Sequence, residues 1–221
     1  AEALDEYGAS AAASRLVTGT LAVHDSLEGR LASFKGYPAA LLFGSGYMTT
    51  AGVIPSVVGR NDAVFADRLV HASILDAISL SRARLHRFRH NDAGHLGELL
   101  ARHRGPERKL VVTESVFSID GDLAPLSAIV EQAQAYHALL MVDEAHSLGV
   151  LGKTGRGVQE HFGLDPDDID AFQPPAGFSE FFDSYLDLEH PQGLWQQHRN
   201  AVRTHAGLWT RLFDQCGLGL R

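Results

Sequence analysis

Two carboxylates and a histidine, Asp143, Glu144 and His146, follow the apolar run of residues 139–142. The run is too short for a helix, and it is typical of a strand buried on both faces of a parallel sheet. Ligands of open α/β sheets bind beyond the carboxyl ends of such strands. An ionised Asp143 there would pair with a cationic ring nitrogen, such as the pyridinium of pyridoxal 5'-phosphate (PLP). The alternative is that both acids cap the next element and that His146 packs as an ordinary histidine.

A small turn that contains glycine, Ser45-Gly46-Tyr47, follows an expected short buried strand at 39–43 and opens a helix. Backbone N–H groups at a helix N-terminus, together with the helix dipole, suit a phosphate group. Many tight turns between a strand and a helix use glycine only for its geometry, so the signal is weak when taken alone.

Three further polar side chains follow expected strands. His71 comes after residues 63–66, where its flat ring could stack on an aromatic cofactor or could simply start a helix without a ligand. Glu114 and Ser118 come after residues 109–113. Because ligands of such sheets lie over the carboxyl edge, a single ligand could touch all of these groups.

The elements that must position these residues alternate regularly along the chain. Short apolar runs predict strands at 39–43, 63–66, 85–88, 109–113 and 139–142. Helices of about 10 to 15 residues are expected between most of them. This alternation predicts an α/β fold with a mostly parallel sheet, helices on both faces and right-handed crossovers.

Two other patterns favour purely structural roles. Asp25 and Glu28 have the spacing of a reciprocal helix cap, with Gly36 ending that helix. Four arginines in residues 82–90 favour a solvated edge of the sheet over an anion site.

The charge balance and the cysteine content exclude several classes of protein. The net charge is −8, with 19 basic and 27 acidic residues and no long basic run, so nucleic acid and anionic membranes are not favoured partners. A single cysteine, Cys216, excludes an internal disulfide framework and fits a reducing, cytoplasmic compartment. We find no apolar stretch approaching 18 residues and no signal-peptide pattern, so we expect neither a membrane-spanning helix nor a secretory signal. A length of 221 residues allows one good core and a small second lobe.

Eight stretches occur in an order that is specific to one enzyme family. They are SRLVTG (14–19), GYPAALLF (36–43), SGY (45–47), HASI (71–74), HND (90–92), ESVFSIDGD (114–122), VDEAHSLG (142–149) and GRG (155–157). On these motifs, residues 7–170 resemble the large domain of the α-oxoamine synthases, which are fold-type-I PLP enzymes. The resemblance implies a PLP-dependent transferase fold of the aspartate aminotransferase type, with an incomplete large domain and part of a small C-terminal domain.

The resemblance also assigns roles to the residues introduced above. Asp143 would pair with the pyridine nitrogen of PLP, His71 would stack on its ring, and His146 would hydrogen-bond its phenolic oxygen. These three are the expected catalytic residues, and no metal is expected. The expected cofactor-binding residues are Ser45, Gly46, Tyr47, His71, Glu114, Ser118, Asp143 and His146.

The reaction implied by the family is the decarboxylative condensation of a small amino acid with an acyl thioester, carried by coenzyme A or by an acyl carrier protein. Residues 67–92 favour a member that uses alanine. Residues 143–157 fit a serine palmitoyltransferase-like member equally well, and a 2-amino-3-ketobutyrate ligase-like member stays open. A homodimer is expected, in which residues 14–20 serve the neighbouring subunit.

The resemblance fails where the family carries its Schiff-base lysine, in a Thr/Ser-x-x-Lys motif after a strand expected near 168–170. The lysines of this chain are Lys35, Lys109 and Lys153, and none of them stands in such a motif. Residues 173–176 already resemble the linker into the small domain, so a middle block is missing. Either the chain omits residues of the real protein, which we favour because deleted strands would expose a large apolar edge, or the gene product lacks them.

We therefore expect three regions and two classes of function. The regions are an N-terminal arm (1–23), a truncated PLP-binding large domain (24–172), and a linker helix with the start of a small C-terminal domain (173–221), with helices near 178–188 and 194–213. The function is either that of an active synthase or that of a catalytically silent homologue that binds PLP without a Schiff base. An NAD-binding protein is disfavoured, because no G-x-G-x-x-G motif follows the first strand.

Overall fold

The computed structural model describes residues 2–9, 13–103, 105 and 107–164. The strand expected near 168–170, the linker, both helices of the tail and Cys216 lie outside the described residues. The chain divides into two compact units, one of which comprises Leu27–Phe172, while Ala1–Ser26 belongs to the other. No described helix has both the length and the apolar character needed to span a membrane.

From α4 to α8 the helices and strands alternate as the sequence predicts. The helices are α1 (Glu2–Tyr7), α2 (Arg15–Thr18), α3 (Ala22–Lys35), α4 (Gly46–Val57), α5 (Ala72–Ser81), α6 (Ala93–Arg102), α7 (Leu126–Ala135) and α8 (Val158–Phe162). The strands are β1 (Ala63–Asp67), β2 (Arg84–Phe88), β3 (Lys109–Glu114) and β4 (Leu139–Asp143).

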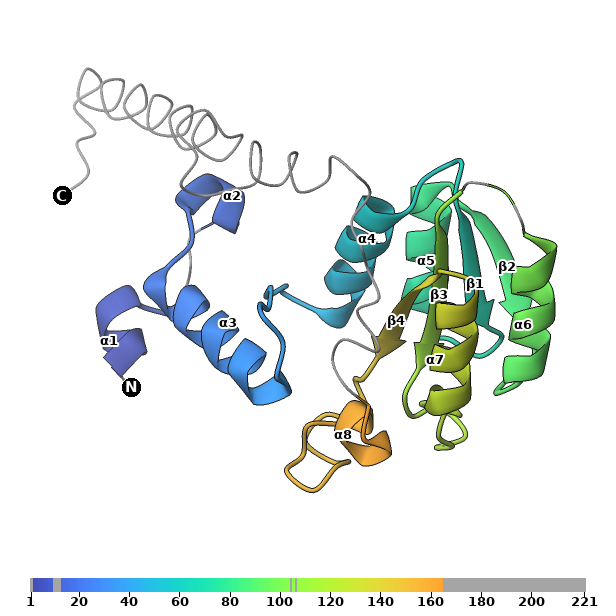
Figure 1. Ribbon diagram of the computed structural model, residues 1–221. Helices are drawn as coiled ribbons and strands as arrows, with labels where there is room; N and C mark the ends of the chain where they lie inside the picture. The colour runs from blue at the N-terminus through green and yellow to red at the C-terminus, as the bar shows by residue number, and fades with distance from the viewer. Residues whose placement is uncertain (1, 10–12, 104, 106, 165–221) are drawn as a thin grey trace, which may run out of the picture. The chain divides into compact units, whose positions relative to one another are not determined.

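The four strands form one parallel sheet in the order β2-β1-β3-β4. Helices α4 and α5 cover one face, where Ile54, Ile74 and Ile78 pack on Val64 and Val112. Helices α6 and α7 cover the other face (Figure 1), and their buried leucine, isoleucine and alanine side chains pack on Phe65, Phe88 and Val111 of the strands. The α/β fold with helices on both faces is therefore confirmed, and every strand ends at the same edge.

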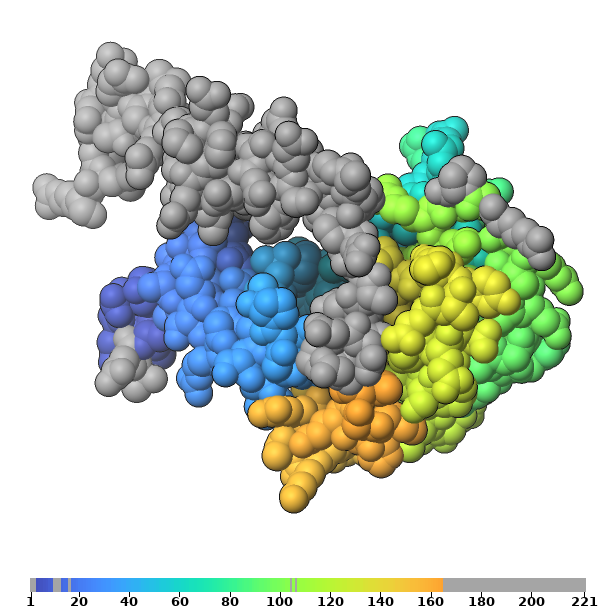
Figure 2. Space-filling model, viewed as in Figure 1, coloured from blue at the N-terminus to red at the C-terminus, as the bar shows by residue number. Residues whose placement is uncertain are grey.

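A third cluster of apolar side chains fastens α8 to the sheet. Val158 packs on Leu126 and Val130 of α7, and Leu140 and Val142 of β4 border the cluster. The segments of α7 and α8, coloured yellow and orange, lie side by side in Figure 2. The loop after Asp143 is thereby held at both of its ends.

The expected strand at 39–43 is wrong, and so is the reciprocal cap of Asp25 and Glu28. Residues 39–43 are not a strand, and Leu41 is 67% exposed. In a strand, the Leu42 N–H would donate to a neighbouring strand. Here it donates to Glu28 Oε1 at 2.7 Å. Asp25 lies in the first turn of α3, which begins at Ala22.

The expectation that residues 139–142 are buried on both faces is also wrong. All residues of β4 are partly exposed. Among the described strands, β4 pairs with β3 alone, so it lies at an outer position of the sheet. The apolar pattern predicted a strand correctly, but the pattern does not report how many neighbours that strand has.

Candidate active site

Two carboxylates meet at the carboxyl edge of the sheet. Glu114 ends β3 and Asp143 ends β4, and the two residues are paired in register, so that their side chains lie beside each other. Glu114 is only 3% exposed, and among the described residues its Oε1 atom has no hydrogen-bond partner. A buried carboxylate oxygen without a partner is costly, which makes it a marker for a ligand.

The protonation of Glu114 reflects these surroundings. Burial raises the pKa of the Glu114 carboxyl, and the neighbouring negative charge of Asp143 raises it further. The backbone N–H groups of His71 and Ser118 act against this by lowering the pKa. The pKa is raised on balance, so a donor or a cation placed at Glu114 would relieve an unfavourable charge.

His71 stands at the start of α5, where its side chain caps the helix. Its Nδ1 atom accepts the backbone N–H of Ser73 at 3.2 Å and lies 2.8 Å from the Ser73 hydroxyl. Because Nδ1 is an acceptor, the neutral ring carries its proton on Nε2. The residue is exposed, so the ring is available to a ligand above the sheet edge.

The turn at residues 45–47 opens α4 as predicted. The Ser45 hydroxyl accepts the backbone N–H of Met48 at 3.2 Å and thereby acts as the N-cap. The N–H groups of Gly46 and Tyr47 belong to the first turn of the helix, which has no partners for them within the helix. Gly46 and Tyr47 are exposed residues, as an anion site requires.

Two hydrogen bonds join the starts of α4 and α5. Thr50 Oγ1 donates to the Ser73 carbonyl at 3.3 Å, and the Tyr47 hydroxyl donates to Asp76 Oδ2 at 3.4 Å. The turn at Ser45 is thus tied to the helix that His71 begins. A continuous set of contacts therefore runs from α4 through α5 to the edge carboxylate Glu114.

The remaining predicted residues are less enclosed. Asp143 Oδ1 accepts the backbone N–H of Ala145 at 2.9 Å, which orients the carboxylate. Ser118 is exposed, although its backbone N–H acts on Glu114. His146 is exposed, and no hydrogen bond to it is found among the described residues. The structure therefore brings His71, Ser118 and Asp143 to Glu114. The place of His146 in this group stays a prediction.

Glu144 is a structural residue. This agrees, for Glu144, with the alternative in which the two acids cap the next element and bind no ligand. Its carboxylate forms an ion pair with Lys35 at 2.5 Å and accepts hydrogen bonds from the Ser147 hydroxyl and the Val158 N–H, both at 2.9 Å. Both side chains of the ion pair are only 17% exposed. Glu144 thus ties α3 and α8 to the loop after β4.

None of the three lysines stands beside Glu114. Lys35 is held by Glu144 and by the Arg156 carbonyl at 2.6 Å. Lys109 begins β3, at the opposite end from Glu114, and donates to the Tyr136 carbonyl at 3.4 Å. Lys153 is exposed in the loop before α8.

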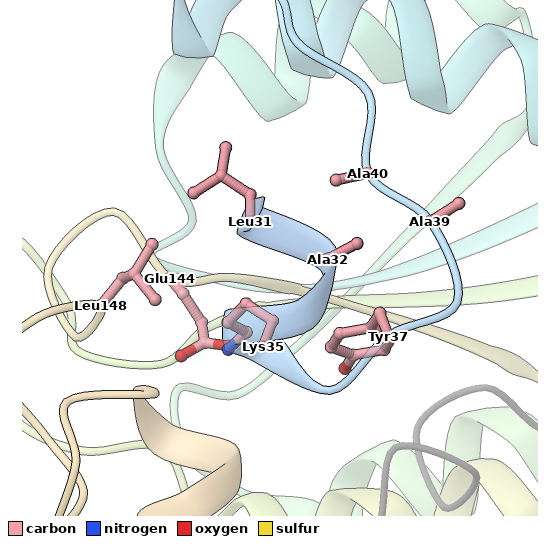
Figure 3. A pocket seen from close by; sticks show the side chains of 8 residues that line it. All are labelled: Leu31, Ala32, Lys35, Tyr37, Ala39, Ala40, Glu144 and Leu148. Atoms are coloured by element: carbon pink, nitrogen blue, oxygen red, sulfur yellow. The ribbon is translucent and has the colours of Figure 1, made fainter. Parts of the chain in front are cut away.

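A cavity of about 210 Å³ is lined by none of the predicted catalytic and cofactor-binding residues, and it shares only Glu144 and Leu148 with the motif at residues 142–149. Figure 3 shows that Lys35 and Glu144 point toward each other at its wall, between small and apolar side chains. The lining residues are Leu31, Ala32, Lys35, Tyr37, Ala39, Ala40, Glu144 and Leu148. Since its two charged groups neutralise each other, the cavity is not the centre of the predicted chemistry.

The prediction missed a polar network beside the site. Asp67 ends β1 and is fully buried, and it accepts a hydrogen bond from His90, which also contacts Asp122. An acidic residue at a strand end was the signal used for Asp143, and the same signal was present at Asp67. The partners of Asp67 are far apart in the sequence, so only the fold identifies them.

Comparisons with known proteins show the family to which the chain belongs. Residues 1–170 match the family model for aminotransferase class I and II, and the chain belongs to that family. The 8-amino-7-oxononanoate synthase of Geobacter sulfurreducens is 57% identical over 166 residues, which are 75% of this chain and 42% of that protein. The enzyme of the same name from Azoarcus sp. is 53% identical over 164 residues, 74% of this chain and 42% of its own length.

Solved structures of the same group are also similar. Serine palmitoyltransferase of Sphingomonas wittichii has a TM-score of 0.72 at 39% identity and covers 76% of this chain and 42% of its own. A variant of serine palmitoyltransferase from S. paucimobilis with bound PLP and myriocin has a TM-score of 0.72 at 41% identity, over 75% and 43% of the two chains. 8-Amino-7-oxononanoate synthase of Francisella tularensis has a TM-score of 0.61 at 33% identity, over 74% and 44%.

These findings confirm the resemblance to the α-oxoamine synthases and the PLP-dependent transferase fold. The chain spans about two fifths of the length of the curated relatives it matches.

Proposed function

We propose that this chain forms part of a PLP-dependent α-oxoamine synthase, which joins a small amino acid to an acyl thioester with loss of carbon dioxide. The favoured reaction is that of 8-amino-7-oxononanoate synthase in biotin biosynthesis, with alanine as the amino acid, because several curated relatives carry that name. The acyl group would come from coenzyme A or an acyl carrier protein. The observation that carries the proposal is the unpartnered Glu114 oxygen beside Asp143, next to His71.

The described residues fit PLP by their chemistry. Asp143 is a carboxylate at a strand end, as a pyridinium partner must be, and His71 offers an exposed ring at the start of α5. The first N–H groups of α4, at Gly46 and Tyr47, suit the phosphate, with Ser45 as the cap. We assign the phenolic oxygen of the cofactor to His146 and Ser118.

When bound, PLP supplies an electron sink for the carbanion that forms when the amino acid loses a proton or carbon dioxide. Asp143 would pair with the pyridine nitrogen and would favour a proton on it, which would strengthen that sink. The part of Glu114 is to accept an N–H of the amino acid substrate on its unpartnered oxygen. His71 limits the approach of water to one face of the cofactor.

A serine palmitoyltransferase-like reaction is the second candidate, because the similar solved structures include enzymes of that name. A catalytically silent homologue is the third, because none of the three lysines stands beside Glu114. The single cysteine favours a cytoplasmic protein, and we expect a homodimer in which residues 14–20 reach the partner.

The test combines the intact mass of the natural protein with its visible absorbance during titration with PLP. A mass well above 23.9 kDa and a band that borohydride reduces would support the synthase. A mass equal to 23.9 kDa without a reducible band would overturn it and leave the silent homologue. Release of carbon dioxide from alanine, serine or glycine, each with one acyl thioester, then separates the candidate reactions.

Asp143→Asn tests the assigned site in the same assay. Asparagine can still accept the Ala145 N–H, so the fold should persist while the charge is lost. We expect activity to fall by about 100-fold or more, in line with the loss of a charged hydrogen-bond partner. The control is Glu131→Gln, which removes an exposed carboxylate of α7. Equal activities of both variants would show that Asp143 is not at the site.

A further inference from the structure

His90 occupies an unusual position between two carboxylates. Its Nδ1 atom lies 2.9 Å from Asp67 Oδ1, and its Nε2 atom lies 2.9 Å from Asp122 Oδ2. A neutral imidazole carries one N–H and can donate to only one of them, whereas the imidazolium donates to both. Burial lowers the pKa of His90, but the hydrogen bonds to Asp67 and Asp122 outweigh it, and the pKa is raised on balance. The geometry therefore favours the charged ring.

Asp67 fixes the segment that leads to His71. The residue is fully buried at the end of β1, and its Oδ1 atom accepts the Leu69 N–H at 2.8 Å. Its Oδ2 atom accepts the Asn91 N–H at 2.9 Å. A single carboxylate thus orders the turn between β1 and the helix that His71 caps, and it joins this turn to the loop after β2.

Asp122 fixes the segment that carries Ser118. The backbone closes here into a turn, since the Phe117 N–H donates to the Asp122 carbonyl at 3.0 Å. Asn91 Nδ2 donates to Asp122 Oδ2 at 2.7 Å. The ring of Phe117 packs edge-on against His90, with 4.4 Å between the ring centroids. His90 therefore contacts the turn through both a charge and an aromatic surface.

We propose that His90, as an imidazolium, is a positioning residue that joins the turn before His71 to the turn that carries Ser118, so that both flank Glu114. The proposal rests on the proposed function only where it concerns catalysis. His71 and Ser118 direct their backbone N–H groups at Glu114 from these two turns. The ring joins both turns through one pair of charged hydrogen bonds, which are among the strongest polar contacts available to it.

The charged groups around the ring support this arrangement. Asp67 faces it from β1, and Asp122 and Asp120 face it from the turn, with ligand atoms of His90, Asp120 and Asp122 all within 4.8 Å of one another. Arg89, the adjacent residue in the chain, is paired with Asp92. The imidazolium is therefore the positive charge that these acids share.

The test is amide hydrogen exchange of the full protein in His90→Gln, which loses the charge and can no longer donate from both ends of a ring. We expect exchange in the turns 68–71 and 117–122 to rise together, by about tenfold or more. The matched control is His137→Asn, an exposed histidine whose left-handed backbone (φ 51°) asparagine tolerates. Unchanged exchange in His90→Gln, or a rise in one turn alone, would overturn the proposal.

Enzyme kinetics separate positioning from stability. We expect kcat of His90→Gln to fall about tenfold with PLP still bound. The loss of wild-type activity as the pH rises through the raised pKa of the ring should be absent from the variant. An unchanged pH profile would reduce His90 to a structural residue. If the wild type binds no PLP, the proposed function fails, but the exchange result still decides the coupling of the turns.

A second variant and a chelator control complete the experiment. If His90→Gln does not fold, Asp122→Asn replaces it, because the Asp122 side chain is 42% exposed and its loss is milder. It should raise exchange in the same two turns. Addition of EDTA to the wild type tests the competing arrangement, in which the cluster binds a metal ion. If EDTA reproduced the exchange pattern of His90→Gln, a bound cation and not the imidazolium would hold the turns, and the proposal would be wrong.

Discussion

The loop that begins at Glu144 and the sheet edge at Glu114 place carboxylates in opposite situations. Glu144 has partners on both oxygens, because Lys35, Ser147 and Val158 all contact it. Glu114 is more deeply buried as a residue, yet one of its oxygens has no partner among the described residues. Both residues lie close to the end of a strand, so their positions in the sequence look alike.

Whether both carboxylate oxygens have partners distinguishes a group that maintains the fold from a group that is available to bind a ligand. A satisfied ion pair holds segments together and has little capacity for further bonds. An unsatisfied buried carboxylate lowers stability and is tolerated where a ligand later contacts it. On this argument the loop at Glu144 is structural, and we propose that the edge at Glu114 belongs to the site.

The largest effect on stability is expected from Glu144→Gln. Loss of one partner leaves the Lys35 charge without its ion pair in a mostly buried setting, and such changes cost about 3 kcal/mol of unfolding free energy. Urea denaturation measures this value. The double variant Glu144→Gln/Lys35→Met should lose less unfolding free energy than the two single variants lose in total. Strictly additive effects would show that the pair is not coupled, and would break the comparison.

Gly157→Ala should be next in size. Gly157 has φ 92°, and a Cβ atom there would collide with the Glu144 carboxylate. We expect a loss of about 2 kcal/mol from backbone strain and the displaced carboxylate. Gly29→Ala is the matched control, because that helical glycine has nothing within 4 Å of an added Cβ. The control should be neutral or stabilising, and equal losses in both variants would contradict the role given to Gly157.

Glu114→Gln should act in the opposite direction to Glu144→Gln. The pKa of Glu114 is raised by burial and by Asp143, so the wild type loses stability as pH rises from about 4.5 through the folded-state pKa. Glutamine removes the like-charge contact, and we expect a gain of about 1 kcal/mol at pH 8 that disappears near pH 4. Thermal unfolding at both values of pH checks this. A loss of stability at pH 8 would place Glu114 with the structural carboxylates.

The smallest effect on stability is expected from a change at His86. This residue shows where the comparison between partnered and unpartnered groups stops applying. Its Nε2 atom is also buried without a partner among the described residues, yet its ring packs against Phe65 and His103 in the middle of β2. An unpartnered atom is therefore a marker for a ligand only where it lies at the edge that ligands reach.

Burial, followed by the charges of His103 and Arg84, lowers the pKa of His86. The folded state thus favours the neutral ring, and wild-type stability should fall as pH drops below about 6.5. In His86→Phe this fall should be shallower, by less than about 1 kcal/mol between pH 7 and pH 5. Denaturation curves at the two pH values measure the difference. A fall as steep as that of the wild type would show that His86 does not contribute.

Much of the fold follows from local pattern. The runs at 63–66, 109–113 and 139–142 are strands because apolar runs of that length between turns fit a sheet, and Ser45 starts a helix because its hydroxyl can cap one. The run at 39–43 is also apolar but does not form a strand. A strand needs a neighbouring strand to accept its N–H groups, and the Leu42 N–H donates to Glu28 instead. The local sequence pattern indicates which element a segment can form, while the segments that pack beside it decide whether that element forms.

The candidate site divides in the same way. The sequence by itself determined that Asp143, Glu114 and His71 lie at or just after the carboxyl ends of strands in one parallel sheet, since the alternation of elements predicts it. Only the tertiary structure decided that β4 pairs with β3, so that Asp143 flanks Glu114, and that Glu144 forms its ion pair with Lys35. The reason is that chain order carries no information on strand order, and that a carboxylate acquires its role from partners more than 100 positions away.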